Sequence, residues 1–359
     1  MGWVAMRPLT ATIDTAALAH NLRVVRAHAA GARVLAVVKA NAYGHGLQRA
    51  VRALADADGL SLIEIDAAVR LREGGYGKRI VLLEGLFEAA ELEMAARCDL
   101  SLVIHGEAQL RMLDEAPAAA RFDVLLKINT GMNRLGFPLS QVTAVLECLQ
   151  RHRAVRAVTL MTHFAAADEA RGVDWQFASF STLAALHQLP ATLANSAAVL
   201  RYPQTHVDWV RPGIMLYGCS PFAETSAATL GLKPVMTLAS RVLAVQEIAA
   251  GDSVGYGSVF VADAPMRIGV VACGYADGYP RHAPTGTPLL VAGWRTRTLG
   301  RIAMDLLCCD LTAMPELGVG APVVLWGEGL SADEVAAAAG TVSYELLCAL
   351  APRVPVIER

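Results

Sequence analysis

The stretch AVVKANAYGHG, Ala36 to Gly46, runs through apolar residues to one lysine and then continues in small and polar residues. A continuous apolar run is typical of a strand buried on both faces, as in a parallel sheet. Lys39 stands where this run ends, and it is one of only four lysines among 31 basic residues. An amine, unlike a guanidinium, can lose its proton when desolvated and can bond to a carbonyl carbon. Lys39 is therefore the first candidate for a functional amine.

Similar apolar runs recur through the first two-thirds of the chain. They predict strands at Val34–Val38, Gly59–Glu64, Ile80–Leu83, Leu100–Ile104, Phe122–Ile128, Val155–Thr162, Ala191–Leu193 and Ile214–Tyr217. Segments with apolar residues three and four apart lie between them and predict helices at Leu47–Ala55, Ile65–Gly74, Glu88–Arg97, Glu107–Glu115, Ser140–Arg151 and Val173–Leu186. About eight such units favour an N-terminal (β/α)8 TIM barrel over an open sheet.

The pattern changes after Leu232. Short β-prone runs broken by Gly and Pro follow, at Val235–Gln246, Arg267–Ala272, Thr287–Val291, Thr296–Leu299, Leu306–Asp310 and Pro322–Trp326. One helical segment is expected at Ser331–Ala339. We therefore expect a barrel over residues 1–232 and a C-terminal, mainly-β domain over residues 233–359.

Composition excludes several classes of function. The net charge is −2, which leaves no basic field for nucleic acid. The first residues show no apolar core with a cleavage site, and no apolar run is long enough for a bilayer, so we expect neither a signal peptide nor a membrane partner. The seven cysteines include no C-x-x-C pair, which favours reduced thiols in a cytoplasmic protein. Motifs for phosphate loops, dinucleotides, zinc hydrolysis and serine hydrolysis are absent, and no metal site is expected.

Polar side chains follow several of the expected strands. In a barrel, catalytic groups come from the C-terminal ends of the strands, which meet at one mouth. The residues in that position are Lys39, Lys127, His163, Asn195 and Ser196, and Arg211 directly precedes the stretch PGIMLYG. Each one alone is more often a structural hydrogen-bonding residue or a solvated charge than a catalytic one. Their common placement at one edge favours a functional site.

The late loops of the expected barrel also offer an anion site. The sequence Arg211-Pro212-Gly213-Ile214 and the pair Asn195-Ser196 supply backbone N–H groups and short polar side chains at the usual phosphate position of this fold. A lysine amine and a phosphate site at a barrel mouth suggest pyridoxal phosphate bonded to the lysine. On these residues alone, aldolase-type Schiff-base chemistry is supported nearly as well.

Nine blocks of the sequence, in order, resemble the alanine racemase family. They are AVVKANAYGHG, KINTGMNRLGF, MTHFAAAD, ANSAAVL, VRPGIMLYG, VGYGSVF, GYADGYPR, GRIAMD and SYELLCAL. The resemblance covers essentially the whole chain. It implies a fold-type III pyridoxal 5'-phosphate enzyme that interconverts L- and D-alanine, with a (β/α)8 barrel, a C-terminal β domain and a head-to-tail homodimer with shared active sites. Asn129 is a departure, because many members carry Asp there.

The resemblance also implies roles for individual residues. Lys39 resembles the Schiff-base lysine and first catalytic base, and Tyr256 of the other subunit resembles the second base. Arg211 matches the arginine that faces the pyridine nitrogen of the cofactor. His163 matches the residue that links this arginine to the second base. Arg134 matches the residue that contacts the cofactor's phenolic oxygen and the substrate carboxylate. The phosphate ligands correspond to Tyr43, Asn195, Ser196, Gly213, Ile214 and Tyr344. Met304 of the partner chain matches a residue that contacts the substrate. Lys127 matches a lysine that is often carbamylated in the family. The residues that would line the entry corridor are Asp168, Tyr275, Arg281, Arg301 and Asp305.

The chemistry of racemisation agrees with this resemblance. One base must remove the α-proton from one face while a second group returns a proton to the other, which a lysine and a tyrosine can do. A decarboxylase of the same fold type is an alternative, although it is expected to carry a cysteine in place of the Tyr256 block. A non-catalytic pyridoxal-phosphate carrier is another, although such carriers resemble the barrel alone. D-Alanine for peptidoglycan and D-alanine breakdown both remain open as cellular roles.

Overall fold

A computed structural model describes residues 7–359, which fold into two compact units. The barrel unit comprises residues 22–42 and 50–216, and the β unit comprises residues 7–21, 43–49 and 217–359. Residues 1–6, on which the expectation about a signal peptide partly rests, lie outside the described residues. From residue 7 onward, no helix combines the length and apolar content needed to cross a bilayer.

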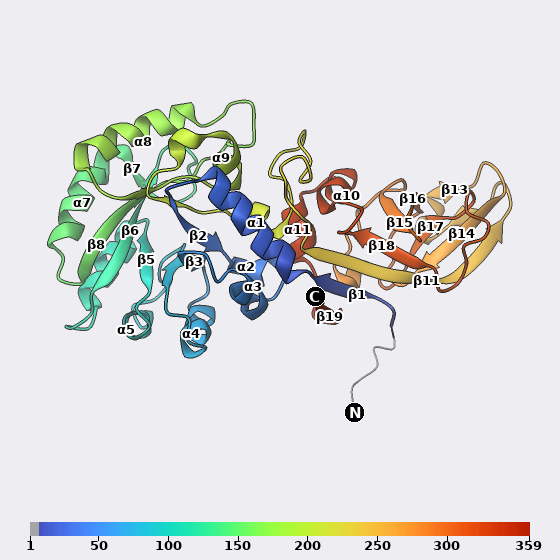
Figure 1. Ribbon diagram of the computed structural model, residues 1–359, viewed down its shortest axis with the longest axis horizontal. Helices are drawn as coiled ribbons and strands as arrows, with labels where there is room; N and C mark the ends of the chain where they lie inside the picture. The colour runs from blue at the N-terminus through green and yellow to red at the C-terminus, as the bar shows by residue number, and fades with distance from the viewer. Residues whose placement is uncertain (1–6) are drawn as a thin grey trace. The chain divides into compact units, whose positions relative to one another are not determined.

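Eight parallel strands close into a ring in the barrel unit, which confirms the predicted TIM barrel (Figure 1). In ring order they are β2 (Arg33–Val37), β3 (Gly59–Leu62), β4 (Arg79–Leu82), β5 (Ser101–Ile104), β6 (Phe122–Asn129), β8 (Val155–Met161), β9 (Ala191–Thr192) and β10 (Trp209–Val210). A short strand, β7 (Phe137–Pro138), pairs with the end of β6. All residues of β3 and β5 are buried, as expected for strands covered on both faces.

Helices follow the strands and cover the outside of the ring (Figure 1). They are α1 (Thr15–His28), α3 (Leu47–Ala53), α4 (Ile65–Glu73), α5 (Glu91–Arg97), α6 (Glu107–Met112), α7 (Val142–Arg151), α8 (Asp174–His187) and α9 (Ser196–Arg201), with 3₁₀ turns η1 (Leu113–Glu115), η2 (Leu139–Gln141) and η3 (Pro203–Thr205). In α7 the buried residues are Val142, Val145, Leu146 and Leu149. This spacing of three and four places one apolar stripe against the strands.

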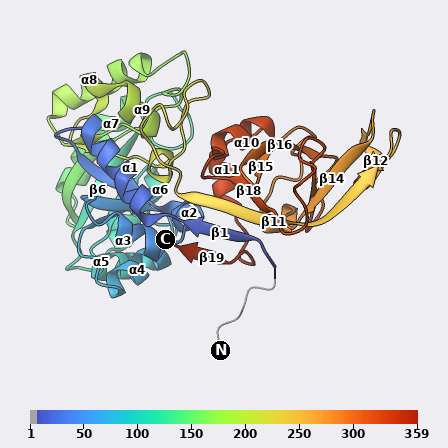
Figure 2. The same cartoon turned by 45° about the vertical axis from the view of Figure 1, so that its right-hand side comes forward.

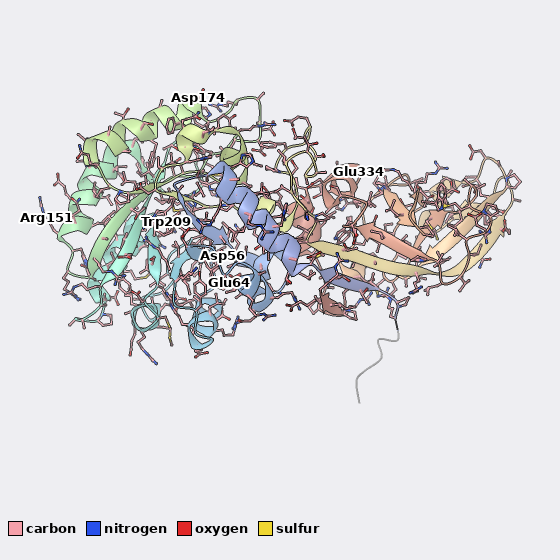
Figure 3. The ribbon with its side chains drawn as sticks, in the orientation of Figure 1. Asp56, Glu64, Arg151, Asp174, Trp209 and Glu334 are labelled. Atoms are coloured by element: carbon pink, nitrogen blue, oxygen red, sulfur yellow. The ribbon has the colours of Figure 1, made fainter. Side chains whose placement is uncertain are left out.

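The interior of the ring is a packed core. Leu35, Val81, Val103, Leu125, Met161 and Trp209 form one cluster, to which six different strands each contribute one residue. Trp209, marked in Figure 3, is the first residue of β10 and is buried. The guanidinium of Arg33 lies 4.0 Å from the centre of the Trp209 ring, and that of Arg79 lies 5.3 Å away. The N-terminal end of the barrel is therefore closed by cation–π stacking, which leaves the opposite end for chemistry.

The predicted strand at Ile214–Tyr217 is wrong. These residues form a buried 3₁₀ turn, η4 (Ile214–Tyr217), and the eighth strand is the two-residue β10 before Arg211. A short buried apolar run has the same pattern in a strand and in a helical turn, so periodicity does not separate them. The correction moves Arg211 from a position before the last strand to the position directly after it.

The β unit is mainly antiparallel, which confirms the predicted mainly-β fold after the barrel (Figure 2). Its strands are β1 (Thr10–Ile13), β11 (Met236–Ile248), β12 (Ser253–Val254), β13 (Phe260–Val261), β14 (Met266–Val271), β15 (Pro288–Val291), β16 (Trp294–Leu299), β17 (Leu307–Asp310), β18 (Pro322–Trp326) and β19 (Val356–Glu358). It also contains η5 (Tyr256–Ser258), η6 (Tyr275–Asp277), α10 (Ala332–Ala338) and α11 (Ser343–Cys348). The long strand β11 pairs with β14, β18 and β1.

The start of the chain contributes to the β unit. Strand β1 pairs antiparallel with β11 and parallel with β19, so both ends of the described chain are bound into one sheet. The sequence analysis placed no strand at either position. Both strands are short, and neither contains an apolar run of the kind on which the strand predictions rest.

Candidate active site

The chain turns sharply after Lys39. Four consecutive residues, 40–43, have φ between +51° and +55° and form one turn of left-handed helix, α2 (Lys39–Tyr43). Left-handed helical backbone costs about 1–2 kcal/mol per non-glycine residue, so such a turn forms only where its surroundings impose it. Lys39 itself is half-buried at the C-terminal edge of β2. The stretch Ala36 to Gly46 thus consists of a strand end, a lysine and a left-handed turn.

Lys127 lies in a group of cations at the same edge of the barrel. It stands near the end of β6 and is 7% exposed. Burial lowers the pKa of its amine to about 8, and the positive charges of Arg211, Arg134 and Lys39 act in the same direction, while Glu84 opposes them. Since these cations lower the pKa of Lys127, they lie near it. This is consistent with the prediction that the cations at strand ends gather at one mouth of the barrel. A large share of the Lys127 amine is consequently uncharged near pH 8.

Arg211 is buried and is bound to neutral groups. Its Nη1 donates to Thr192 Oγ1 at 2.6 Å, and its Nη2 donates to the carbonyl oxygen of Thr162 at 2.7 Å and to that of Leu193 at 3.3 Å. Burial lowers its pKa to about 10. Among residues 7–359 no carboxylate lies within ion-pair distance of this guanidinium. A buried cation without a counterion is suited to an anionic or electron-rich ligand.

His163 stands beside Arg211, directly after β8. The Nη2 of Arg211 lies 3.5 Å from His163 Nδ1, a long contact. Burial holds the pKa of the imidazole well below its usual value, and the neighbouring charges of Arg211, Arg134 and Lys127 lower it further. The ring is therefore neutral at physiological pH. Since the guanidinium is a donor, Nδ1 accepts and Nε2 carries the proton.

The late loops contain the predicted anion-binding elements. Asn195 is the N-cap of α9, and its Oδ1 accepts from the N–H of Ala198 at 3.0 Å. The buried Ser196 hydroxyl oxygen accepts from the N–H of Gly213 at 2.9 Å and from that of Met215 at 3.4 Å. Ile214 is fully buried in η4. Ser196 thus joins the loops after β9 and β10.

Arg134 lies in an exposed loop after β6 that Asn129 organises. Asn129 Oδ1 accepts from the N–H groups of Gly131 and Asn133, both at 3.0 Å, and its Nδ2 donates to Asn133 Oδ1 at 3.0 Å. An aspartate can fulfil the acceptor role but not the donor role. The departure at Asn129 therefore preserves the turn that presents Arg134 and adds one side-chain bond to it.

In the β unit, Tyr43 packs within an aromatic group. Its ring stacks on that of Tyr217 with centroids 4.6 Å apart, and the ring of Tyr344 lies 6.1 Å away. The ring of His45 also stacks on that of Tyr217, with the two ring centroids 4.7 Å apart. Burial raises the pKa of Tyr43 and of Tyr217, so both phenols stay protonated. The two tyrosines predicted as phosphate ligands, Tyr43 and Tyr344, are thus neighbours.

A second group of predicted residues gathers elsewhere in the β unit. Tyr256 is 72% exposed in η5, and a Cβ built on the preceding Gly255 would lie 3.6 Å from the carbonyl oxygen of Arg301. The N–H of Tyr275 donates to Ala303 at 3.0 Å, next to Met304, which is 52% exposed. A Cβ on Gly274 would lie 2.4 Å from the Met304 carbonyl oxygen, so only glycine permits this approach. Exposed aromatic and apolar side chains at one place are typical of an interaction surface.

The remaining predicted corridor residues occupy different settings. Asp305 accepts from Arg353 Nη2 at 2.7 Å, next to an ion pair of Arg353 with the buried Asp277 at 2.7 Å. Arg281 is exposed on the β unit. Asp168 is exposed in the loop after β8 of the barrel unit. The structure does not bring Asp168 or Arg281 into contact with the other predicted residues.

Sequence analysis overlooked two buried polar residues at the barrel edge. Gln176, on α8, and Thr130, after β6, form hydrogen bonds with the loops that carry His163 and Arg134. The spacing of these residues in the sequence was a signal. Val173, Gln176 and Phe180 are three and four residues apart and all are buried, so the glutamine takes a core-facing position in an otherwise apolar stripe. Buried glutamine is uncommon and requires partners.

Fold and site together define a class: a two-domain barrel protein whose mouth gathers a lysine, a buried arginine and a neutral histidine. Comparison with known proteins narrows the class. The family model "Alanine racemase, N-terminal domain" matches residues 13–221, and "Alanine racemase, C-terminal domain" matches residues 235–358. The chain belongs to the alanine racemase family of enzymes.

Individual alanine racemases are similar to this chain over nearly its full length. An alanine racemase of Thiobacillus denitrificans is 58% identical over 353 residues, covering 98% of this chain and 96% of the relative. The structure of a biosynthetic alanine racemase from Pseudomonas aeruginosa superposes with a TM-score of 0.95 at 47% identity, covering 99% of this chain and 100% of that one. The alanine racemase of Acinetobacter baumannii gives a TM-score of 0.93 at 36% identity, with coverage of 99% and 100%.

Proposed function

We propose that this chain interconverts L- and D-alanine with pyridoxal 5'-phosphate as its cofactor. The observation that carries the proposal is the cation group at the barrel mouth: Lys39, Lys127 and the buried Arg211 lie at one edge with little acidic compensation. Such a site suits a phosphorylated ligand, and Lys39 offers an amine to a carbonyl carbon. The family membership of the chain supports alanine as the substrate.

The residues present fit the proposed cofactor. The helix N-terminus at Asn195 and the N–H groups near Gly213 suit a phosphate, and the phenols of Tyr43 and Tyr344 would add hydrogen-bonding hydroxyls. Lys39 would hold the cofactor covalently, Arg211 would face its ring nitrogen, and Arg134 would bind its phenolic oxygen and the substrate carboxylate. The full phosphate set is Tyr43, Asn195, Ser196, Gly213, Ile214 and Tyr344.

Two bases would then exchange protons at the alanine Cα. The bound cofactor supplies an electron sink that acidifies the α-proton. The amine of Lys39 removes or returns this proton on one face, and the phenol of Tyr256 does so on the other, so that one proton leaves and one arrives with inversion at Cα. The neutral His163 passes the electrostatic influence of Arg211 toward Tyr256. A guanidinium is a poor proton donor, so Arg211 would leave the ring nitrogen of a bound cofactor unprotonated, which would limit side reactions.

The second base is proposed to come from a partner chain. In a head-to-tail homodimer, residues 1–232 would form the cofactor-binding barrel and residues 233–359 would supply Tyr256 and the Met304 backbone to the partner's site. The high exposure of both side chains in the single chain supports this assignment. Asp168, Tyr275, Arg281, Arg301 and Asp305 would line the entry corridor. No disulfide joins any of the cysteines among residues 7–359, which supports a cytoplasmic location, where D-alanine would enter peptidoglycan or be degraded.

Lysine substitution tests the proposal. Purified wild type should show the visible absorbance of bound pyridoxal phosphate and form D-alanine from L-alanine without releasing CO₂. Lys39→Ala and Lys39→Arg should lose both properties, since a guanidinium cannot take over the amine's role. Lys233→Ala is the matched control, because Lys233 is exposed in the β unit, and it should retain both. Near-normal turnover in either Lys39 variant, or CO₂ release by wild type, overturns the proposal.

A further inference from the structure

Gln176 connects two strand ends of the barrel from the outside. Its side chain is fully buried on α8 and makes three hydrogen bonds. Its Oε1 accepts from the N–H of Ala165 at 2.7 Å. Its Nε2 donates to Thr130 Oγ1 at 2.9 Å and to the carbonyl oxygen of His163 at 3.1 Å. One side chain thus holds the loop after β6 and the loop after β8.

The direction of these bonds is fixed by chemistry. A backbone N–H needs an acceptor and a backbone carbonyl needs a donor, so the amide of Gln176 has only one compatible orientation. The hydroxyl of Thr162 donates to the Ile128 carbonyl at 3.0 Å. The 2.8 Å contact between Thr130 and Thr162 is therefore donated by Thr130. Bonds aligned head to tail polarise one another, which strengthens the chain from Gln176 to Ile128.

Groups of the proposed active site lie next to this chain of bonds. Arg211 Nη2 donates to the Thr162 carbonyl at 2.7 Å, while Gln176 holds the carbonyl of His163, the next residue. The two consecutive carbonyls are thus fixed from opposite sides. On the other loop, Thr130 lies three residues after Lys127 and four before Arg134. A substitution at Gln176 would therefore displace both the loop after β6 and the loop after β8.

We propose that Gln176 is a positioning residue that sets the placement of the His163–Arg211 pair and of the Arg134 loop. The inference rests on the proposed function, in which Arg211 faces the cofactor ring. Glutamine is required because the position needs an acceptor and two donors without charge. A glutamate would direct a carboxylate oxygen at the His163 carbonyl, and a methionine would fill the space without any of the bonds.

Gln176→Met and Gln176→Glu test this role. We expect kcat to fall roughly ten- to a hundred-fold, the effect typical of misplacing site groups by a fraction of an ångström to an ångström, with a smaller change in KM. The absorbance band of the bound cofactor should shift, because Arg211 moves. In cofactor-free protein, histidine ring ¹⁵N signals should show a change at His163.

Gln109→Met is a matched control. Gln109 is 7% exposed on α6 and also makes three bonds, accepting from His105 N–H at 3.0 Å and donating to the carbonyls of Glu84 at 2.7 Å and Leu86 at 3.2 Å. The Gln109→Met variant should lose as much stability against urea as Gln176→Met does. It should leave the absorbance band of the cofactor and the NMR signals of His163 unchanged. Thr130→Val should reproduce the Gln176 effect in part, and Thr130→Ser, which keeps the hydroxyl, should restore kcat.

The outcomes separate the two proposals. If wild type forms no D-alanine, the proposed function fails whatever the variants do. If wild type is active but Gln176→Met matches Gln109→Met in band position, His163 signals and kcat, Gln176 has only a structural role. Retained activity in Gln176→Glu or in Thr130→Val overturns the positioning role as well.

Discussion

At the scale of single residues, Lys127 combines burial with unusual reactivity. A neutral amine can add CO₂, forming an N–C bond and releasing one proton, to give a carbamate anion. With its pKa lowered to about 8, Lys127 has this neutral form available near physiological pH. A free ammonium at this position would repel Arg134, Arg211 and Lys39, whereas a carbamate would attract them and orient Arg134.

We therefore expect wild type to incorporate ¹³C-bicarbonate, with a carbamate NMR signal that rises between pH 7 and pH 9. Lys127→Arg keeps a cation but cannot form the carbamate, so it should lack the signal. Loss of the charge-assisted bond to Arg134 should lower kcat/KM about ten- to a hundred-fold. Absence of the signal in wild type, or activity that depends instead on added chloride, contradicts the prediction.

His163 predicts a pH dependence of stability. Burial and nearby cations lower the pKa of its imidazole well below the value of about 6.5 expected in the unfolded chain. The unfolded chain therefore binds a proton below pH 6.5 that the folded chain does not bind. The stability that this residue contributes above pH 6.5 is lost as the pH falls below that value.

Urea unfolding between pH 5 and pH 7 measures this effect. The slope of unfolding free energy against pH should be positive for wild type. His163→Gln, which stays neutral, should reduce it, and the slope that remains should include His105, whose pKa burial also lowers. An unchanged slope in His163→Gln would mean that His163 is protonated in the folded protein.

The sequence predicted those site residues that stand at strand ends. Lys39 and Lys127 each stand at or near the end of a predicted apolar run, and the barrel topology places them at one mouth, whereas Arg211 follows the short strand β10, which was not predicted. It did not predict Gln176, because a glutamine in a helix is usually solvated and its partners come from two distant loops. The uncompensated burial of Arg211 also depends on packing that a linear sequence does not display.

At the scale of elements, the left-handed turn after Lys39 has a testable energetic consequence. Ala40 is exposed and has a φ of +52°, a conformation that costs L-residues other than glycine about 1 kcal/mol or more. Glycine removes that cost but loses about 0.5–1 kcal/mol of backbone entropy on folding. Ala40→Gly should therefore leave the free energy of unfolding unchanged or raise it by up to about 1 kcal/mol.

Ala178→Gly provides the matched control. Ala178 is also exposed but lies within the right-handed helix α8, where glycine costs about 1 kcal/mol. Opposite responses of the two variants in urea unfolding would support the left-handed turn. Equal losses would mean that residue 40 has an ordinary right-handed or extended backbone.

The elements differ in how well their sequences specify them. Strands such as β6, with eight residues, are continuous apolar runs and were predicted within one residue. Strand β10 has two residues, and η4 directly after it is equally apolar, so the assignment fell on the wrong segment. The turn of α2 was not predicted, since positive φ at two alanines and a tyrosine reflects tertiary packing rather than local preference.

At the scale of the whole molecule, the proposed bases lie in different units of the chain. Lys39 belongs to the barrel unit and the exposed Tyr256 to the β unit. Tyr256→Phe should keep the cofactor absorbance but lose most exchange of the L-alanine α-proton. Exchange of the D-alanine α-proton, assigned to Lys39, should persist. Isotope exchange from deuterated water, followed by NMR for each enantiomer, measures the two separately, and equal loss for both enantiomers contradicts the division of labour.

Mixed dimers test whether the two bases meet across a subunit interface. Chains with Lys39→Ala and chains with Tyr256→Phe are each expected to be inactive as homodimers. In a mixed dimer with shared sites, one site carries both substitutions and the other carries neither. Activity should then recover toward half of the wild-type value per mixed dimer. Subunit exchange is confirmed first with two affinity tags, and a mixture of Lys39→Ala with the double variant serves as the control, since it leaves no intact site. No recovery after confirmed exchange would mean that Lys39 and Tyr256 act within one chain.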